Sequence, residues 1–339
     1  MNKRIIAAFA AIALLVIIAG IPLTLVAGLE EDVEPAQTAG AKPLPDEVTV
    51  DYANWSYLSL VLRDRKFLEE EFRGENVKLN WVLTPGGNKS MEFLLSGSVD
   101  VGTGAGVAGI LSFVNGNPIK AIYVTHLHSG DVLVRSDSDI NDIADLKGRD
   151  IAATPATNPY LFLLRALHTE GLRKDDVNII PLQHQDGALA LLRGDVDAWS
   201  GGDRLSAAFS IGEDAEALRS IYKSYEFNTP CFLYARNEFQ QKYPEAVRRI
   251  LSAYDKAREW ALSNPDGYVK IVARENKVTE DIARLMVADW DIQMSGEITD
   301  QDRSSMVATE EVLRQVVRED IDIGQKVDEL LDRSAFRKL

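Results

Sequence analysis

The residues best suited to chemistry in this chain are neutral hydrogen-bond donors, glycines and their small neighbours, all of which come directly after predicted strands. They are Asn54, Trp55, Ser56, Gly87, Asn88, Gly104, Ala105, Gly106, Val107, Thr157, Asn158 and Trp199. In open α/β sheets, ligands bind beyond the carboxyl ends of the strands. We therefore expect these residues to line one cleft, with amides and hydroxyls as donors and the two tryptophans as apolar walls.

Two predicted helices begin at this cleft, one near Gly106 and one at Asn158–Pro159. Asn158 is a good N-cap, and Pro159 suits the first helical position. The free N–H groups and the dipole of a helix N-terminus attract anions. Facing N-termini could hold a planar or tetrahedral oxyanion without lysine or arginine, so the sequence predicts a small anionic ligand.

Charged side chains near the predicted cleft are few. Asp203 and Arg204 follow the strand that contains Trp199. They either pair with each other at the edge of the cleft or contact the ligand. Arg204 is the charged side chain best suited to bind an anion.

His126 and His128 alternate along a predicted strand, which places both imidazoles on one side of it. A metal site needs a third and usually a fourth ligand at fixed geometry. His184 or Asp131 could supply one only through the folding of the chain. We expect no metal and assign the pair to the hinge or the rim of the cleft, with His126 as a ligand contact.

The motifs of common catalytic sites are absent from the sequence, among them a glycine-rich phosphate loop, a nucleophile elbow and HExxH. The single cysteine, Cys231, lies in an apolar predicted strand, and we interpret it as a small buried side chain. A nucleophilic thiol would need a histidine partner, and none is close to Cys231 in sequence. We therefore expect a binding protein with no catalytic residue and no cofactor.

A repeated segment indicates how the cleft is built. LLSGSVDVGTG at residues 94–104 resembles LLRGDVDAWSG at residues 191–201. Each copy follows an amphipathic segment, turns at a glycine suited to the left-handed C′ position, enters a short strand and ends on glycine. We interpret the copies as parts of two similar α/β lobes whose strand ends line one cleft.

The remaining sequence alternates predicted strands and helices, which is typical of a mostly parallel sheet covered on both faces. Residues 58–72 are predicted to form one helix, and the strand at 227–235 is predicted to return to the first lobe. Beyond Asn237 the chain is mostly helical and is expected to wrap that lobe. The prediction is an α/β fold with a helical C-terminal extension. Lobe 1 comprises residues 47–127 and 228–339, lobe 2 comprises residues 128–227, and the crossings between them are hinges.

The N-terminal segment, residues 1–28, has a short basic start and an apolar run from Ile5 to Val26. This is the pattern of a secretory signal peptide. The run is also long enough to span a bilayer, so an uncleaved anchor is the alternative. Residues 29–46 are acidic, rich in Pro and Ala, and predicted to be a flexible linker. In either case the folded part is expected outside the cytoplasm.

The composition limits the partners. The chain has 339 residues, of which 46% are hydrophobic, and a net charge of −15. The hydrophobic content suffices for a sizeable core in two domains. The negative charge argues against nucleic acid and anionic membrane surfaces, which leaves an N-terminal anchor as the sole expected membrane contact. Because long-range steering opposes an anionic ligand, binding must depend on local donors.

Three segments in combination resemble the periplasmic substrate-binding proteins of ABC importers for aliphatic sulfonates, taurine and nitrate. They are GSVDVGTGAGVAGI (97–110), IADLKGRDIAATPATNPYLFLLRALHTEGL (143–172) and LLRGDVDAWSGGDRLSAA (191–208). The resemblance extends from about Val48 to Glu319. It implies a type II Venus-flytrap fold that captures a small sulfonate-like anion and delivers it to the permease and ATPase of an ABC importer.

The same resemblance implies ligand contacts at Asn54, Trp55, residues 104–107 and 157–158, and near Trp199. The chain departs from the family pattern in ATPATNPY, where sulfonate binders often have a serine-rich loop, and in the residues 200–204 that follow Trp199. The alternatives are a receptor for nitrate or a pyrimidine precursor, an enzyme on this scaffold such as a desulfinase, and an anchored sensory domain.

Overall fold

The computed structural model describes residues 43–128, 130–202, 215–223, 229–288 and 290–336. Residues 42–339 form one compact unit. The predicted N-terminal signal or anchor, most of the predicted linker, and Asp203 and Arg204 lie outside the described residues. No helix among the described residues is long and apolar enough to cross a membrane.

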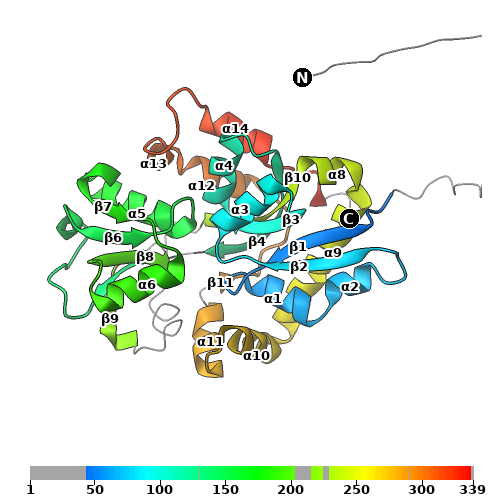
Figure 1. The fold of residues 1–339 in the computed structure, drawn as a ribbon, viewed down its shortest axis with the longest axis horizontal. Helices are drawn as coiled ribbons and strands as arrows, with labels where there is room; N and C mark the ends of the chain where they lie inside the picture. The colour runs from blue at the N-terminus through cyan, green and yellow to red at the C-terminus, as the bar shows by residue number, and fades with distance from the viewer. Residues whose placement is uncertain (1–42, 129, 203–214, 224–228, 289, 337–339) are drawn as a thin grey trace, which may run out of the picture. The chain divides into compact units, whose positions relative to one another are not determined.

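The unit is built on two sheets (Figure 1). The first sheet has the order β11-β4-β10-β3-β1-β2 and comprises β1 (Glu47–Tyr52), β2 (Lys78–Leu83), β3 (Val101–Ala105), β4 (Ile119–His128), β10 (Thr229–Arg236) and β11 (Trp290–Asp291). The second has the order β7-β6-β8-β5-β9 and comprises β5 (Asp131–Arg135), β6 (Asp150–Ala153), β7 (Asn178–Ile180), β8 (Ala198–Gly202) and β9 (Leu218–Lys223). The predicted return of a strand to the first sheet is confirmed, because β10 lies between β3 and β4.

Both sheets are mixed, whereas the sequence predicted mostly parallel ones. In the first sheet β1 is parallel to β2 and β3, but β10 is antiparallel to β3 and β4. In the second sheet β6 is parallel to β7 and β8, but β5 is antiparallel to β8 and β9. The antiparallel strands β5 and β10 are those that the chain enters directly from the other sheet. The alternation of strands and helices does not reveal their direction.

Helices cover both faces of each sheet (Figure 1). One face of the first sheet packs against a cluster that includes residues of α1 (Tyr57–Asp64), α2 (Phe67–Glu71), α8 (Asn237–Lys242), α9 (Pro244–Ser263), α10 (Pro265–Asn276) and α11 (Glu280–Ala288). The other face packs against α3 (Gly87–Ser96), α4 (Gly106–Val114), α12 (Asp300–Val307), α13 (Glu310–Leu313) and α14 (Ile323–Leu330). The second sheet has α5 (Asn158–Thr169) on one face and α6 (His184–Arg193) on the other.

Local conformation departs from the predictions at one helix. The single helix predicted over residues 58–72 is wrong, because the chain breaks between α1 and α2. Lys66, at this break, has φ of 58°, in the left-handed region that a helix does not use. The predicted glycine turns are confirmed at Gly97, Gly148, Gly171 and Gly194, all with φ between 71° and 78°. The strand β9 has no counterpart in the prediction.

The C-terminal helices also contact α5, which covers the second sheet, although the sequence predicted that they would wrap the first lobe. Leu161 and Leu164 of α5 belong to the same buried cluster as Val312 and Leu313 of α13. Polar contacts extend this packing. His168 Nε2 lies 3.0 Å from Glu311 Oε1, and the Lys174 N–H donates to Gln315 Oε1 at 3.2 Å. Hydrophobicity along the helices predicts a buried face but not which element covers it.

Candidate functional site

The predicted site residues lie where strands end and helices begin. Helices α1, α3, α4, α5 and α6 follow β1, β2, β3, β6 and β7 respectively. None of these five N-termini has a side-chain cap, a feature they share with α2, α8, α9, α10 and α13. The first N–H groups of a helix have no partner within the helix. The uncapped N-termini therefore offer backbone donors to a ligand.

In the first sheet, α3 and the end of β3 approach each other closely. A Cβ added to Gly87 would lie 3.2 Å from Gly104 Cα and 3.3 Å from the Ala105 nitrogen. These are backbone atoms that cannot easily move aside, so the contact needs glycine at position 87. The parallel strands β1 and β3 end at the same edge. The structure therefore brings residues 54–56, 87–88 and 104–107 together.

A contact through Cys231 joins α5 of the second sheet to this edge. The Asn158 Nδ2 donates to Cys231 Sγ at 3.5 Å. Cys231 is paired with Ala105 on β3 and with His126 on β4. The structure thus places Asn158, Ala105 and His126 around one cysteine, which no local pattern in the sequence indicates.

The start of α5 differs in detail from the prediction. Asn158 was predicted to be the N-cap, but it is the first helical residue, and Thr157 occupies the cap position. The Thr157 hydroxyl donates to the Thr154 carbonyl at 2.7 Å, so it does not cap the helix. Both Thr157 and Asn158 are buried. Because this helix starts one residue earlier than predicted, Asn158 keeps its side chain free for Cys231.

The start of α6 is a part of the site that the sequence did not predict. A Cβ added to Gly86, just before α3, would lie 3.4 Å from Gln183 Oε1 and 3.8 Å from His184 Cδ2. His184 Nδ1 lies 3.3 Å from the Thr154 hydroxyl at the end of β6. The contact connects the helix starts of the two sheets. We use "strand-end cluster" for residues 54–56, 87–88, 104–107, 157–158 and 183–184.

Several buried polar atoms of the strand-end cluster have no hydrogen-bond partner among the described residues. They are Trp55 Nε1, Ser56 Oγ, Asn88 Oδ1, Asn158 Oδ1 and Gln183 Oε1. Ser56 is 0% exposed and Asn158 is 2% exposed. Native proteins rarely leave buried polar groups unpaired, because each one costs about 1–3 kcal/mol. Their concentration at the N-termini of four helices, α1, α3, α5 and α6, indicates a place where a polar ligand binds.

The histidines of the site are uncharged at neutral pH. Burial, together with a smaller effect of the neighbouring His128, lowers the pKa of His184 to about 4. Burial and the same neighbour hold the pKa of His126 well below its usual value. His126, predicted to contact the ligand, is 2% exposed on β4. Among the described residues, no group of three or more His, Cys, Asp or Glu is arranged to hold a metal ion.

Trp199 lies in the core of the second sheet, against the beginning of α6. Its indole packs in the core between β8 and α6, where a Cβ added to Gly187 would lie 2.6 Å from Trp199 Cδ1. Trp199 is 3% exposed. The structure therefore makes this tryptophan part of the core of the second sheet, although its side chain was predicted to be a cleft wall. The alternation of side chains along β8 directs it toward α6.

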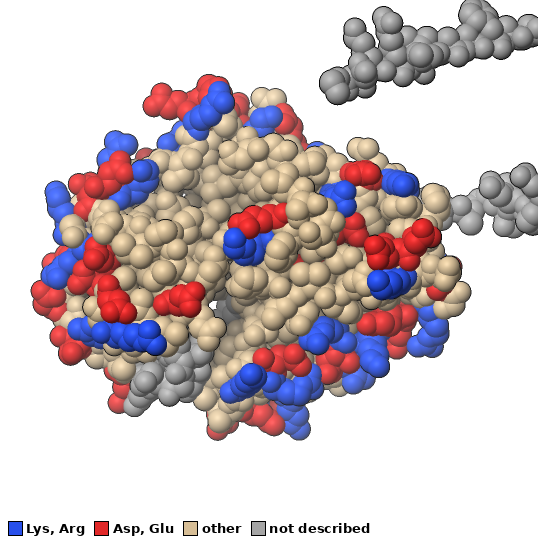
Figure 2. Space-filling model, in the orientation of Figure 1, with Lys and Arg blue, Asp and Glu red and all other residues tan. Residues whose placement is uncertain are grey.

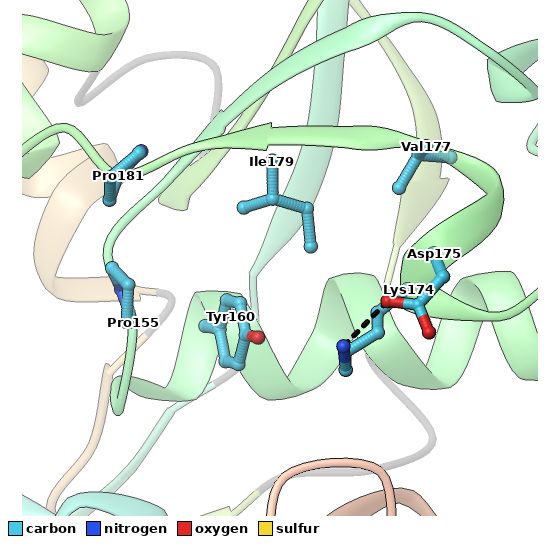
Figure 3. Close-up of a pocket in the computed structure, with 7 residues that line it drawn as sticks. All are labelled: Pro155, Tyr160, Lys174, Asp175, Val177, Ile179 and Pro181. Carbon is cyan, nitrogen blue, oxygen red and sulfur yellow. Dashed lines mark hydrogen bonds and ion pairs between the residues drawn. The ribbon is translucent and has the colours of Figure 1, made fainter.

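A separate pocket of about 450 Å³ lies between α5, β7 and the short helix η2 (Lys174–Asp176) (Figure 3). Its lining is formed by Pro155, Tyr160, Lys174, Asp175, Val177, Ile179 and Pro181. At its polar end the Lys174 ammonium lies 2.6 Å from Asp175. None of the predicted site residues lines this pocket. Its cation is already paired, so the pocket offers an anion less than the strand-end cluster does.

Surface charge adds little to either region. On the face shown in Figure 2, lysine and arginine lie beside aspartate and glutamate, mostly toward the edges, and the middle is largely uncharged. Many lysines and arginines of the described residues form ion pairs at the surface, such as Lys89 with Glu92 at 2.7 Å. Exposed pairs of this kind contribute little to stability or to attraction at a distance.

Comparison with known proteins identifies the family. A family model described as NMT1/THI5 like matches residues 72–268. The putative aliphatic sulfonates-binding protein of Bacillus subtilis (strain 168) is 29% identical over 232 residues, which cover 66% of this chain and 69% of that protein. These matches confirm the resemblance that the sequence segments suggested.

Solved structures confirm the predicted fold class. The alkanesulfonate-binding protein SsuA from Xanthomonas axonopodis pv. citri, bound to MOPS, has a TM-score of 0.75 at 20% identity, covering 86% of this chain and 99% of that one. The desulfurization enzyme DSZB has a TM-score of 0.60 at 16% identity, covering 87% and 98%. The fold is thus shared by a binding protein and an enzyme. The chain belongs to the NMT1/THI5-like family, since the family model matches more than half of the length of the chain.

Proposed function

We propose that this protein is the extracytoplasmic solute-binding component of an ABC importer and that it captures a small sulfonate-like anion. The observation that carries the proposal is the convergence of five helix N-termini, four of which carry unpartnered buried donors or acceptors. Helix N-termini bind oxyanions through backbone N–H groups and the helix dipole. The names of the B. subtilis relative and of SsuA, both sulfonate binders, support this ligand class.

The proposed capture uses two lobes that close on the ligand. Residues 47–127 with 228–339 form lobe 1, and residues 128–227 form lobe 2, with hinges where the chain crosses between the sheets. Residues 1–28 act as the export signal or as an anchor. The partners are the permease and the ATPase of the importer. Asn54, Trp55, Ser56, Gly87, Asn88, residues 104–107, His126, Thr157 and Asn158 contact the ligand, and Arg204 is a further anion contact.

We propose binding without catalysis. Cys231, the single cysteine, is 3% exposed and is held between β3 and β4. Burial raises the pKa of its thiol, which disfavours the thiolate that a nucleophilic mechanism needs. His126 lies opposite it, yet burial keeps that imidazole neutral and its pKa low. A desulfinase-like reaction therefore has no activated nucleophile at Cys231.

Thermal unfolding of the purified protein with ethanesulfonate, taurine, MOPS, sulfate and nitrate tests the proposal. A ligand present at 100 times its Kd stabilises the folded state by about 2.7 kcal/mol. For a folded unit of this size that corresponds to a Tm rise of about 4 °C. Stabilisation by nitrate alone would replace the proposed ligand, and conversion of a sulfonate during incubation, followed by NMR, would contradict binding without catalysis.

A matched pair of substitutions tests the location. Asn158→Asp adds a negative charge at the N-terminus of α5 with almost no change of volume, and we expect it to weaken sulfonate binding by about 10-fold or more. Asn264→Asp makes the same change at the exposed start of α10, and binding should not change. Equal affinities of the two variants would place the anion elsewhere.

A further inference from the structure

Asp51 is a buried carboxylate directly behind the strand-end cluster. It lies on β1 and is 0% exposed. Its Oδ1 accepts a hydrogen bond from the Thr103 N–H of β3 at 2.9 Å, and its Oδ2 accepts one from the Ser90 hydroxyl of α3 at 2.7 Å. Thr103 precedes Gly104, and Ser90 lies one turn after Gly87. Asp51 therefore connects the elements that present residues 54–56, 87–88 and 104–107.

Asp51 has no counter-charge. Among the described residues, no lysine, arginine or histidine forms an ion pair with it, and its hydrogen-bond partners are the Ser90 hydroxyl and the Thr103 N–H. The titratable group that faces it is the Tyr254 hydroxyl of α9, whose pKa is raised by burial and by Asp51.

The charged groups of the neighbouring elements are engaged elsewhere. On α9, the Arg258 guanidinium donates to the backbone carbonyls of Ile292 and Met294. On α3, Lys89 and Glu92 pair at the surface. Asp100, immediately before β3, pairs with Arg236 at 3.3 Å. A negative charge on Asp51 is therefore stabilised only by dipoles.

The charge of Asp51 changes near neutral pH. Burial raises the pKa of its carboxyl to about 7, against the opposing effect of the hydrogen bonds from the Ser90 hydroxyl and the Thr103 N–H. An anion bound at the strand-end cluster would repel a charged Asp51 through a buried, weakly screening environment. The contacts of Asp51 include no cation that would reduce this repulsion.

We propose that Asp51 is a positioning residue that takes up a proton from solvent when the anion binds, so that the protein captures anion and proton together. This inference rests on the proposed function, because it needs an anion at the strand-end cluster. The proton resides on a carboxyl oxygen of Asp51, and the same oxygens hold α3 and β3 in place through Ser90 and Thr103. Release of the proton would favour release of the anion.

The proposal predicts a defined pH profile. Below about pH 6, Asp51 is protonated in both the free and the bound protein, so the affinity is constant. Above pH 7 the free protein loses the proton, and the affinity falls by up to about 10-fold per pH unit until the bound form also titrates. His126 and His184 stay neutral throughout this range because burial lowers their pKa values.

Isothermal titration of the purified protein with ethanesulfonate, a monoanion at every pH used, tests the inference. Titrations run between pH 5.5 and 8.5, in pairs of buffers with different ionisation enthalpies, measure the affinity and the protons taken up. We expect uptake that approaches one proton per ligand above pH 7. In Asp51→Asn the uptake should vanish and the affinity should become independent of pH. The matched control is Asp100→Asn, just before β3. In this variant the proton uptake and the pH dependence of the affinity should remain as in wild type.

Ser90→Ala provides a second variant if Asp51→Asn does not fold. It removes a hydrogen bond that stabilises the charged carboxylate, so the fall in affinity should begin at a higher pH than in wild type. Wild-type binding with a pH-independent affinity overturns the inference alone. No binding of ethanesulfonate at any pH overturns the proposed function together with the inference. An identical pH profile in wild type and Asp51→Asn also overturns the inference, since a purely structural role would change only the affinity.

Discussion

Gly109→Ala should destabilise the protein, although alanine is normally the better residue in a helix. Gly109 lies inside α4, where an added Cβ would overlap the hydroxyl and ring carbons of Tyr234 on β10. Tyr234 is 0% exposed, and its hydroxyl donates to the Ala105 carbonyl at 3.1 Å. The methyl group can be accommodated only if the ring leaves this position or if α4 moves away from the sheet.

The magnitude follows from three contributions. Overpacking of a buried site typically costs about 1–3 kcal/mol. Loss of the hydrogen bond to the buried Ala105 carbonyl costs about 1–3 kcal/mol more. The better helix propensity of alanine returns about 1 kcal/mol. The sum is a loss of about 1–5 kcal/mol, or a Tm lowered by about 2–8 °C.

Urea unfolding followed by circular dichroism measures this loss. The matched control is Gly324→Ala in α14, where the nearest atom to an added Cβ is Asp322 Oδ1 at an ordinary 3.4 Å. We expect the control to keep or slightly gain stability. The cost of Gly109→Ala should also shrink when Tyr234 is replaced by valine, because the overlap then disappears. A Gly109→Ala protein as stable as the control would refute the steric argument.

Two further predictions concern buried charges. The pKa of Asp51 is raised from 3.8 to about 7, so between these pH values the folded state holds a proton that the unfolded state releases. This difference contributes up to roughly 4 kcal/mol to the free energy of unfolding. The contribution is fully present below pH 4 and is lost as the pH rises through 7. The stability of Asp51→Asn relative to wild type should therefore increase between pH 5 and 8 in urea unfolding, and a constant difference would contradict the assigned pKa. Arg258, 5% exposed, donates to the carbonyls of Ile292, Met294 and Thr125 and to the Tyr123 hydroxyl. Arg258→Met should cost about 3–5 kcal/mol because these acceptors lose their partner, and a loss below 1 kcal/mol in the same assay would show that they find other donors.

Local signals in the sequence predict the turns and the starts of elements. Glycine at positions 97, 148, 171 and 194 marks backbone with positive φ, which few other residues adopt. Lys66 adopts the same conformation without such a signal, and the predicted helix was too long as a result. The direction of β10 and the packing of Trp199 depend on which element lies opposite, and that information is not local.

The residues of the strand-end cluster illustrate the same limit. Those that follow strands, such as Ser56 and Asn88, could be chosen because of their position and polarity. Gln183 and Asp51 could not be chosen in this way. Gln183 is brought to the site by its contact with Gly86, and Asp51 lies within β1, behind the site. Cys231 was correctly interpreted as buried, but its contact with Asn158 joins residues 73 positions apart.

The contact between α13 and α5 affects how the protein can be recombined with its relatives. A chimaera that exchanges only residues 131–223 would transfer the whole second sheet with α5 but would leave behind Val312, Leu313 and Gln315, which complete the packing around that helix. The exchanged segment would then meet a surface selected for a different sequence. A functional exchange of binding specificity should therefore carry residues 310–317 along with the second sheet, because these two distant stretches of the chain pack as one unit.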